Sequence, residues 1–208
     1  MTIDRLRHDG AEHLRRNCPV LGPVVEQVGP CRLRLRRDRF AALARAILYQ
    51  QISGLAAKSI HDRLLAKLPD GRLAPRGLAD LDDADYRAAG VSGQKAKYLR
   101  SLAELTLAGK VRLTGLDGWS DERIVEELVQ VKGVGVWTAQ MFLIFTLGRP
   151  DVLPADDLGV RSAIRKLYGL SELPQRDDCE RLARPWRPFA SVASWYCWRS
   201  LEIRDPGV

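Results

Sequence analysis

The sequence lacks any long apolar run. No segment approaches the ~20 consecutive apolar residues that a transmembrane helix requires. The first ten residues, MTIDRLRHDG, are too polar for a secretory signal. We therefore expect a soluble intracellular protein of the cytoplasm, without membrane spans.

Residues that bind metals through their side chains are also scarce. The chain has four cysteines and three histidines. Cys18, Cys31, Cys179 and Cys197 form no CxxC pair and do not cluster with the histidines. This spacing predicts free thiols in a reducing compartment and no metal site built from side chains.

Acidic residues are fewer than basic ones. Lys and Arg total 33 against 26 Asp and Glu, which gives a net charge of +7 and an isoelectric point near 9.5. A polyanion is the natural partner for such a chain. With 208 residues, of which 46% are hydrophobic, the chain is long enough for one sizeable core or for two small lobes.

Strand patterns are almost absent. Only residues 28–37, VGPCRLRLRR, alternate apolar and basic residues as a short strand would. From Arg39 onward, apolar residues instead recur at helical spacing. We predict an all-α domain over residues 38–208, preceded by an irregular N-terminal segment, residues 1–37, that includes the short strand.

The predicted helices begin at recognisable caps. Ser53, Ser92 and Ser120 each precede a stretch with helical periodicity, and their hydroxyls can accept hydrogen bonds from first-turn N–H groups. The stretches 40–51 and 137–147 are apolar around most of their circumference, which indicates buried helices. Further helices are predicted within 53–68, 83–90, 93–109, 120–131, 158–169 and 189–202.

Two glycines separate two of these helices in the stretch VKGVGVWTAQ, residues 131–140. Glycines allow backbone angles that are closed to other residues, so KGVG can form a short turn between the helices. One interpretation is a plain structural corner. The other is an anion site, because free N–H groups at the start of the second helix favour a phosphate group.

The stretch LVQVKGVGVWTAQ resembles the helix-hairpin-helix of DNA glycosylases. The resemblance implies that the hairpin turn binds DNA phosphate and often a monovalent cation, Na⁺ or K⁺, through backbone carbonyls. The phosphate contacts would fall on Lys132, Gly133, Val134, Gly135 and Thr138, and the cation ligands on the carbonyls of Val131, Gly133 and Val136.

The same superfamily carries its catalytic aspartate in a Gly/Pro-rich loop beyond the hairpin. In the loop RPDVLPADDLGVRSAIRKLYG, that position matches Asp157, which lies 22 residues after Gly135. Asp156 is then a neighbouring cap or loop residue. The alternative for Asp157 is that it only caps the helix that follows.

Two further stretches resemble one branch, the 3-methyladenine DNA glycosylase II group. RAILYQQISGLAAKSI is similar to the helix pair whose loop inserts a side chain into DNA, which places intercalation at Gln51 with Ile52 beside it. RPWRPFASVASWYCWRS is similar to that group's last helix. The resemblance covers residues 38–204. It implies two helical lobes with the active site in the cleft between them, and an N-terminal β domain that is absent or reduced.

An alkylated purine is cationic or nearly so, and aromatic faces attract it by about 0.5–2 kcal/mol. The resemblance assigns the base pocket to residues that could otherwise pack in the core: Trp137, Trp195, Tyr49, Tyr196 and Met141. Met141 stands where the best-known bacterial member of the group has a tyrosine.

The resemblance therefore implies a monomeric, monofunctional DNA glycosylase that acts on alkylated purines in double-stranded DNA, with Asp157 as the catalytic carboxylate. Strand-cleaving relatives such as endonuclease III have a lysine where this chain has Trp137, and they bind an iron–sulfur cluster through four clustered cysteines. We expect neither lyase activity nor a cofactor. A non-catalytic DNA-binding module and a glycosylase for another damaged base remain alternatives.

Overall fold

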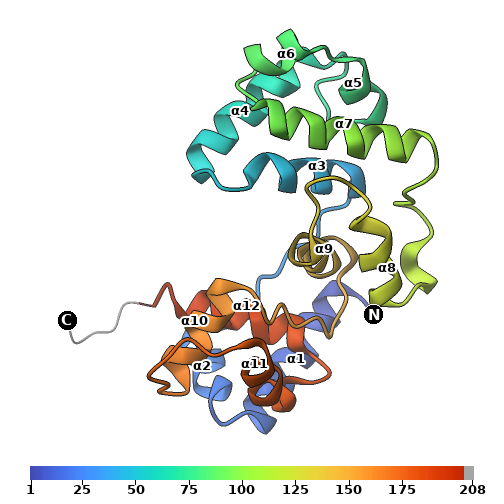
Figure 1. Ribbon diagram of the computed structural model, residues 1–208. Coiled ribbons are helices and arrows are strands. Elements are labelled where there is room, and N and C mark those ends of the chain that lie inside the picture. The colour runs from blue at the N-terminus through green and yellow to red at the C-terminus, as the bar shows by residue number, and fades with distance from the viewer. Residues whose placement is uncertain (204–208) are drawn as a thin grey trace. The chain divides into compact units, whose positions relative to one another are not determined.

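The computed structural model describes residues 1–203, so residues 204–208 of the predicted C-terminal domain lie outside the described part. The described chain is helical and contains no strand, which confirms the predicted all-α class. It forms two compact units. Unit 1 combines Met1–Leu35 with Leu143–Val208, and unit 2 is Arg36–Phe142 (Figure 1).

Unit 2 contains the helices that the sequence predicted best. Ser53, Ser92 and Ser120 accept hydrogen bonds from first-turn N–H groups at 3.3–3.4 Å, so all three predicted caps are confirmed. The α-helices of this unit are α3 (Arg39–Tyr49), α4 (Gly54–Lys67), α5 (Pro75–Asp80), α6 (Asp83–Ala88), α7 (Gly93–Leu107), α8 (Asp121–Leu128) and α9 (Val136–Phe142), with a 3₁₀ turn η1 (Leu116–Gly118) before α8.

Unit 1 is assembled from the two ends of the chain. Its α-helices are α1 (Ile3–Asn17), α2 (Leu21–Val28), α10 (Leu158–Leu167), α11 (Arg176–Leu182) and α12 (Ala190–Ser200). It also contains a π-helical turn η2 (Leu143–Leu147) and a 3₁₀ turn η3 (Arg184–Trp186). Within unit 1, α12 packs against α1, α2 and α10, and Figure 1 shows the blue α1 and α2 beside the red α12.

The prediction of an irregular N-terminal segment with a strand was wrong. Ile3–Asn17 forms α1 and Leu21–Val28 forms α2, while residues 31–36 have no regular secondary structure. The alternation in the sequence is nevertheless reflected in burial, since Cys31 and Leu33 are buried while Arg32 and Arg34 are exposed. Alternating burial of a segment without regular structure therefore produced a strand-like pattern.

The N-terminal helices belong to the core of unit 1. Gly10 of α1 lies so close to α12 that a Cβ atom there would meet Val192 at 2.8 Å. The hydroxyl of Tyr196 on α12 donates to the Gly29 carbonyl at 2.9 Å. Residues 1–35 and the C-terminal helices thus share one packed interior.

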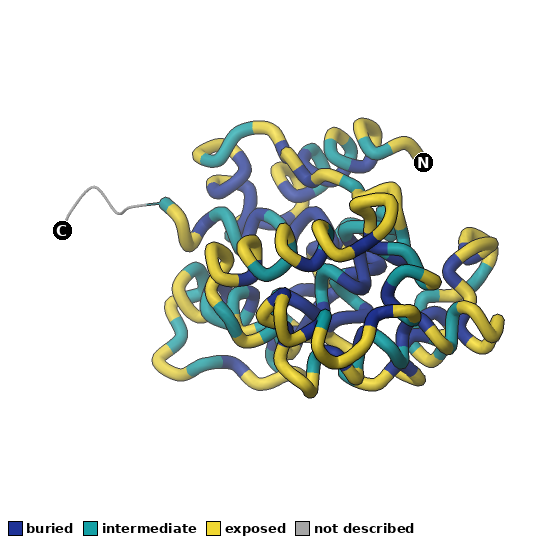
Figure 2. The backbone as a smooth tube through the Cα atoms, turned by 90° about the horizontal axis from the view of Figure 1, so that it is seen from above, coloured by how far each residue is buried: buried dark blue, intermediate teal, exposed yellow. Residues whose placement is uncertain are grey.

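Burial along the chain follows the helical periodicity. Buried and exposed segments alternate along the helices (Figure 2). All four cysteines are free, as predicted, and all four are buried. No helix within residues 1–203 has the length and continuous apolar surface needed to cross a bilayer.

Candidate functional site

The hairpin turn joins α8 to α9 in unit 2, and its two glycines have different roles. Gly133 has a φ of +84°, and a Cβ atom there would overlap the ring of Tyr98. Gly135 has no other atom within 4 Å of its Cβ position, and it is exposed. Gly133 is therefore required for packing within unit 2, while Gly135 leaves the backbone open to a ligand.

The structure divides the predicted phosphate contacts into exposed and buried residues. Lys132 and Gly135 are exposed at the turn. Val134 and Thr138 each keep only 4% of their surface exposed. The N–H of Val134 also donates to the Val131 carbonyl at 3.0 Å. The side chains of Val134 and Thr138 therefore pack within unit 2, and their phosphate contacts stay a prediction.

Two of the three carbonyls predicted to bind a cation already accept a hydrogen bond. The Val131 carbonyl accepts from Val134, and the Gly133 carbonyl accepts from Gln50 Nε2 at 2.9 Å. A carbonyl has a second lone pair, so the cation site stays a prediction. Within residues 1–203, no cluster of three or more His, Cys, Asp or Glu side chains is arranged to bind a metal.

The predicted intercalation loop follows α3. Gln51 is exposed and has a φ of +56°, a left-handed conformation that a non-glycine residue adopts at a cost of roughly 1–2 kcal/mol. Ile52 beside it is half-buried, and Leu55 in the first turn of α4 is 85% exposed. The loop therefore presents a strained polar residue and an apolar side chain at the surface.

Lys95 of α7 holds the end of α3, a role that the sequence did not reveal. Its Nζ donates to the carbonyls of Leu48 and Gln50 at 2.7 and 2.8 Å. Burial lowers the pKa of the Lys95 amine. These hydrogen bonds fix the backbone immediately before Gln51.

The first turns of α7 support the intercalation loop and the hairpin turn together. Lys95 binds the loop backbone, and the Tyr98 ring packs against Gly133. Gln50 completes the connection by donating to the Gly133 carbonyl. A cavity of about 360 Å³ lies among these groups, so the two predicted DNA-contact elements of unit 2 share one support.

Asp157 caps α10 in unit 1, which was the alternative interpretation of this residue. Its catalytic role stays a prediction. Its Oδ1 accepts from the N–H of Val160 and from Nε1 of Trp198, both at 2.8 Å. Asp156 instead forms an exposed ion pair with Arg176 at 3.0 Å, which agrees with its interpretation as a loop residue. The two neighbouring carboxylates therefore have different environments.

The aromatic side chain that reaches Asp157 is Trp198, which the sequence analysis did not select. Trp198 stacks on Phe145, with ring centroids 5.6 Å apart. Gly159 makes room for it, because a Cβ atom there would lie 2.8 Å from Trp198 and 3.0 Å from Asp157 Oδ1. Trp195 and Trp198 are one helical turn apart on α12, and the sequence alone does not say which of them faces α10.

The remaining pocket candidates fall into two groups. Trp137 is 46% exposed on α9, with Met141 one turn further along and half-buried. Trp195 is half-buried and packs edge-on against Tyr196. Tyr196 itself is fully buried in unit 1, so it is corrected to a core residue.

Tyr49 is half-buried in unit 2 and contacts two basic side chains. The Arg45 guanidinium lies 4.1 Å from the centre of its ring. The imidazole of His61 approaches it edge-on, with ring centroids 6.4 Å apart. The role of Tyr49 in the base pocket stays a prediction.

Comparison with known proteins identifies the family. Residues 44–188 match the model of the HhH-GPD superfamily of base excision DNA repair proteins. DNA-3-methyladenine glycosylase 1 of Schizosaccharomyces pombe is 34% identical over 194 residues, which cover 92% of this chain and 85% of that protein. The alkylbase DNA glycosidase-like protein mag2 of the same yeast is 31% identical, over 88% of this chain and 89% of its own length.

Solved structures agree with these matches. The Schizosaccharomyces pombe 3-methyladenine DNA glycosylase in complex with abasic DNA gives a TM-score of 0.86 at 32% identity, covering 96% of this chain and all of that one. A DNA-3-methyladenine glycosidase from Bacillus halodurans gives 0.83 at 31% identity, with coverage of 92% and 88%. The helices, the hairpin and the family match lead to one conclusion: this chain is a member of the HhH-GPD superfamily of base excision DNA repair proteins.

Proposed function

We propose that this protein is a monofunctional DNA glycosylase that removes alkylated purines such as 3-methyladenine and 7-methylguanine from double-stranded DNA. The observation that carries the proposal is the environment of Asp157. One oxygen of this carboxylate is held by two donors at 2.8 Å, and one of those donors belongs to the stacked Trp198. The names of the similar glycosylases support the same reaction class.

The reaction requires the damaged nucleotide to leave the duplex, because stacked bases hide the glycosidic bond. Extrusion costs a few kcal/mol of stacking and pairing. Gln51 is exposed on its loop and is our candidate to fill the vacated space, with Ile52 beside it. The hairpin turn would hold the backbone through Lys132 and Gly135.

Hydrolysis breaks the bond between the sugar C1′ atom and the purine nitrogen. The bonding electrons leave with the base, which loses its positive charge, while positive charge develops on the sugar. The Asp157 carboxylate would stabilise that charge and orient a water molecule. The water oxygen then bonds to C1′ and releases its proton, which leaves an abasic site.

Trp137 is our basis for the monofunctional assignment. Strand cleavage by the related bifunctional enzymes needs a lysine amine that attacks the sugar, and this chain has an indole at that position. An indole nitrogen cannot form a Schiff base. With half of its surface exposed, Trp137 can instead stack on a base, as can the half-buried Trp195.

The decisive experiment incubates the protein with methylated duplex DNA and measures free methylated purines. Asp157→Asn should lower single-turnover release by about 10²–10³-fold, because the charge is lost. Asparagine is as good a helix cap as aspartate, so the melting temperature should change little. Asp156→Asn is the matched control and should release bases at the wild-type rate.

Three outcomes would count against the proposal. Full activity in Asp157→Asn would contradict the role of that carboxylate. DNA binding without any base release by the wild type would support the non-catalytic alternative. Strand breaks that appear without alkali or heat would contradict the monofunctional assignment.

A further inference from the structure

Unit 2 contains a second cavity, separate in its residues from the hairpin turn and the intercalation loop. It has a volume of about 370 Å³ and lies at the start of α3, against α4 and the chain around Arg72. Basic side chains dominate its wall. The ionisable lining residues are Arg36, Arg37, Arg45, Arg72, His61 and Asp38, and we call this the arginine pocket.

The arginines of this pocket have no carboxylate partner in the described chain. None of the four forms an ion pair within residues 1–203, whereas Arg39 pairs with Asp117 at 3.2 Å and Arg100 with Asp83 at 2.5 Å. The one acid of the pocket, Asp38, uses Oδ1 to cap α3, accepting from Ala41 at 2.9 Å. The pocket therefore holds four guanidinium groups against one carboxylate, so the protein neutralises its positive charge only in part.

The basic groups also act on one another. The pKa of Arg36 is lowered by burial and then by the nearby charge of Arg45. The pKa of His61 is lowered by the same two causes in the same order, and Asp62 and Lys58 also act on it. A bound anion would relieve this repulsion, and planar guanidinium groups match the geometry of phosphate oxygens.

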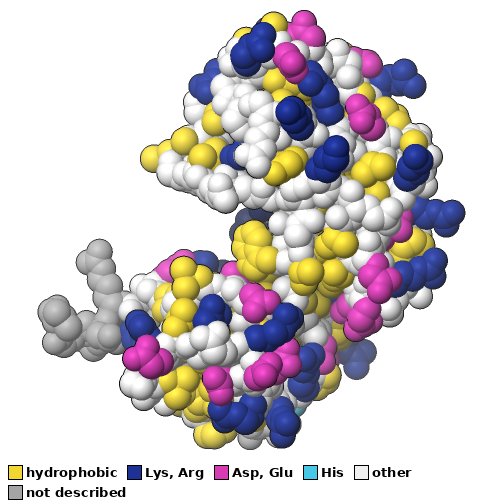
Figure 3. Space-filling model, in the orientation of Figure 1, with side chains coloured by type: hydrophobic (Ala, Val, Ile, Leu, Met, Phe, Trp, Pro, Cys, Tyr) yellow, Lys and Arg dark blue, Asp and Glu magenta, His cyan; other side chains and the backbone are white. Residues whose placement is uncertain are grey.

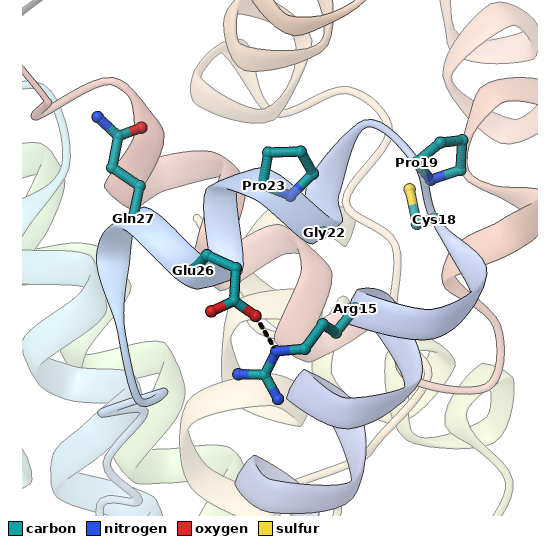
Figure 4. A pocket seen from close by; sticks show the side chains of 7 residues that line it. All are labelled: Arg15, Cys18, Pro19, Gly22, Pro23, Glu26 and Gln27. Atoms are coloured by element: carbon teal, nitrogen blue, oxygen red, sulfur yellow. Dashed lines mark ion pairs between the residues drawn. The ribbon is translucent and has the colours of Figure 1, made fainter.

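The arginine pocket can be compared with the surface charge in general and with one cavity of unit 1. Basic and acidic side chains are intermixed over the face seen in Figure 3, so the net charge alone does not locate a site. The larger cavity in unit 1, about 720 Å³, has only Arg15 and Glu26 as charged lining residues, and they pair with each other (Figure 4). Of these two cavities, the arginine pocket is therefore the one that holds basic side chains without an ion-pair partner.

We propose that the arginine pocket binds a backbone phosphate of DNA, as a phosphate contact of unit 2 additional to the hairpin turn. The choice of DNA as the source of the phosphate rests on the proposed function. The chemistry is shared with free phosphate, and the experiment below distinguishes the two sources.

The test measures binding of undamaged duplex DNA over a range of salt concentrations. The double variant Arg36→Gln/Arg72→Gln changes two arginines of the pocket, and Arg76→Gln/Arg87→Gln removes the same charge from exposed positions elsewhere in unit 2. The pocket variant should bind roughly tenfold more weakly near physiological salt, and its log–log salt slope should fall by about 1 for each lost phosphate contact. The control pair should keep the wild-type slope.

Equal losses in both variants, or no loss in either, would overturn the proposal. Inorganic phosphate gives the second arm. If phosphate raises the melting temperature of the wild type but not of the pocket variant, while the salt slopes for DNA coincide, the ligand is a free anion and DNA is the wrong occupant.

Base release from methylated DNA is measured separately with the same proteins at saturating enzyme. A wild type that shows the expected salt slopes but releases no base would contradict the proposed function alone. Unchanged slopes in the pocket variant together with normal base release would contradict the arginine pocket alone.

Discussion

The chemistry proposed for this protein depends on how one carboxylate is held. The Oδ1 atom of Asp157 accepts from a backbone N–H and from an indole N–H, so the side chain has one orientation. A charge that is already oriented needs no reorganisation when positive charge develops beside it.

Gly159 offers a test of this arrangement that leaves the carboxylate in place. In Gly159→Ala, the new methyl group would meet Trp198 at 2.8 Å and Asp157 Oδ1 at 3.0 Å. The tryptophan must shift, so we expect a loss of stability of about 1–3 kcal/mol and slower base release. Calorimetry and single-turnover kinetics measure the two effects.

The matched control is Gly93→Ala at the first position of α7, where no atom lies within 4 Å of the added methyl group. That variant should be as stable as the wild type or more so, and fully active. A Gly159→Ala protein that behaved like this control would show that close packing of Trp198 on Asp157 is not needed.

Helix α7 supports both of the elements in unit 2 that we propose to contact DNA. Through Lys95 and Tyr98, its first turns contact the end of α3 and the hairpin turn. Gln51 keeps a left-handed backbone conformation directly after the carbonyl that Lys95 binds. A strained residue persists only where its surroundings hold it, so α7 should determine how Gln51 is presented.

Lys95→Met should therefore impair base extrusion. The side chain keeps its length and loses the donor for two carbonyls, which should lower stability by about 1–3 kcal/mol. Base release should slow, and the fluorescence of a 2-aminopurine placed beside the lesion should report less unstacking, because Gln51 is no longer held.

Lys97→Met, an exposed position on the same helix, is the control and should match the wild type. Lys95→Arg restores a donor and should recover part of the extrusion signal. If Lys95→Met loses stability but extrudes bases normally, Lys95 is a structural residue only.

Local signals predicted some elements and missed others for physical reasons. The caps at Ser53, Ser92 and Ser120 could be predicted because a serine hydroxyl binds an N–H group only a few residues further along the chain. Helix α1 was missed because only Leu6, Gly10, Ala11 and Leu14 are buried along its length. Short helices such as α5 carry too few turns to show a period.

The division of the whole molecule differs from the predicted one. The sequence suggested a separate segment before residue 38, yet α1 and α2 pack with α12 in unit 1. Contacts such as Gly10 with Val192, and Tyr196 with Gly29, link positions more than 160 residues apart. A sequence pattern that spans only a few neighbouring residues cannot predict contacts between such distant positions.

A fragment of residues 38–208 should consequently fail to form unit 1. It lacks the fully or almost fully buried Leu6, Leu14, Leu21 and Val25. Removing one buried leucine side chain typically costs about 2–5 kcal/mol, against about 5–15 kcal/mol for a whole domain. We expect lost near-ultraviolet circular dichroism and no base release, although unit 2 can retain helical signal. A fragment with the melting temperature and activity of the full chain would contradict this.

The linear order of residues was enough to predict the all-α class, the hairpin and the serine caps, because each rests on neighbours within a turn or a loop. It was not enough to choose Trp198 over Trp195, to place Tyr196 in the core, or to find Lys95 and the arginine pocket. Those depend on which faces of distant helices meet, and packing across the chain decides that.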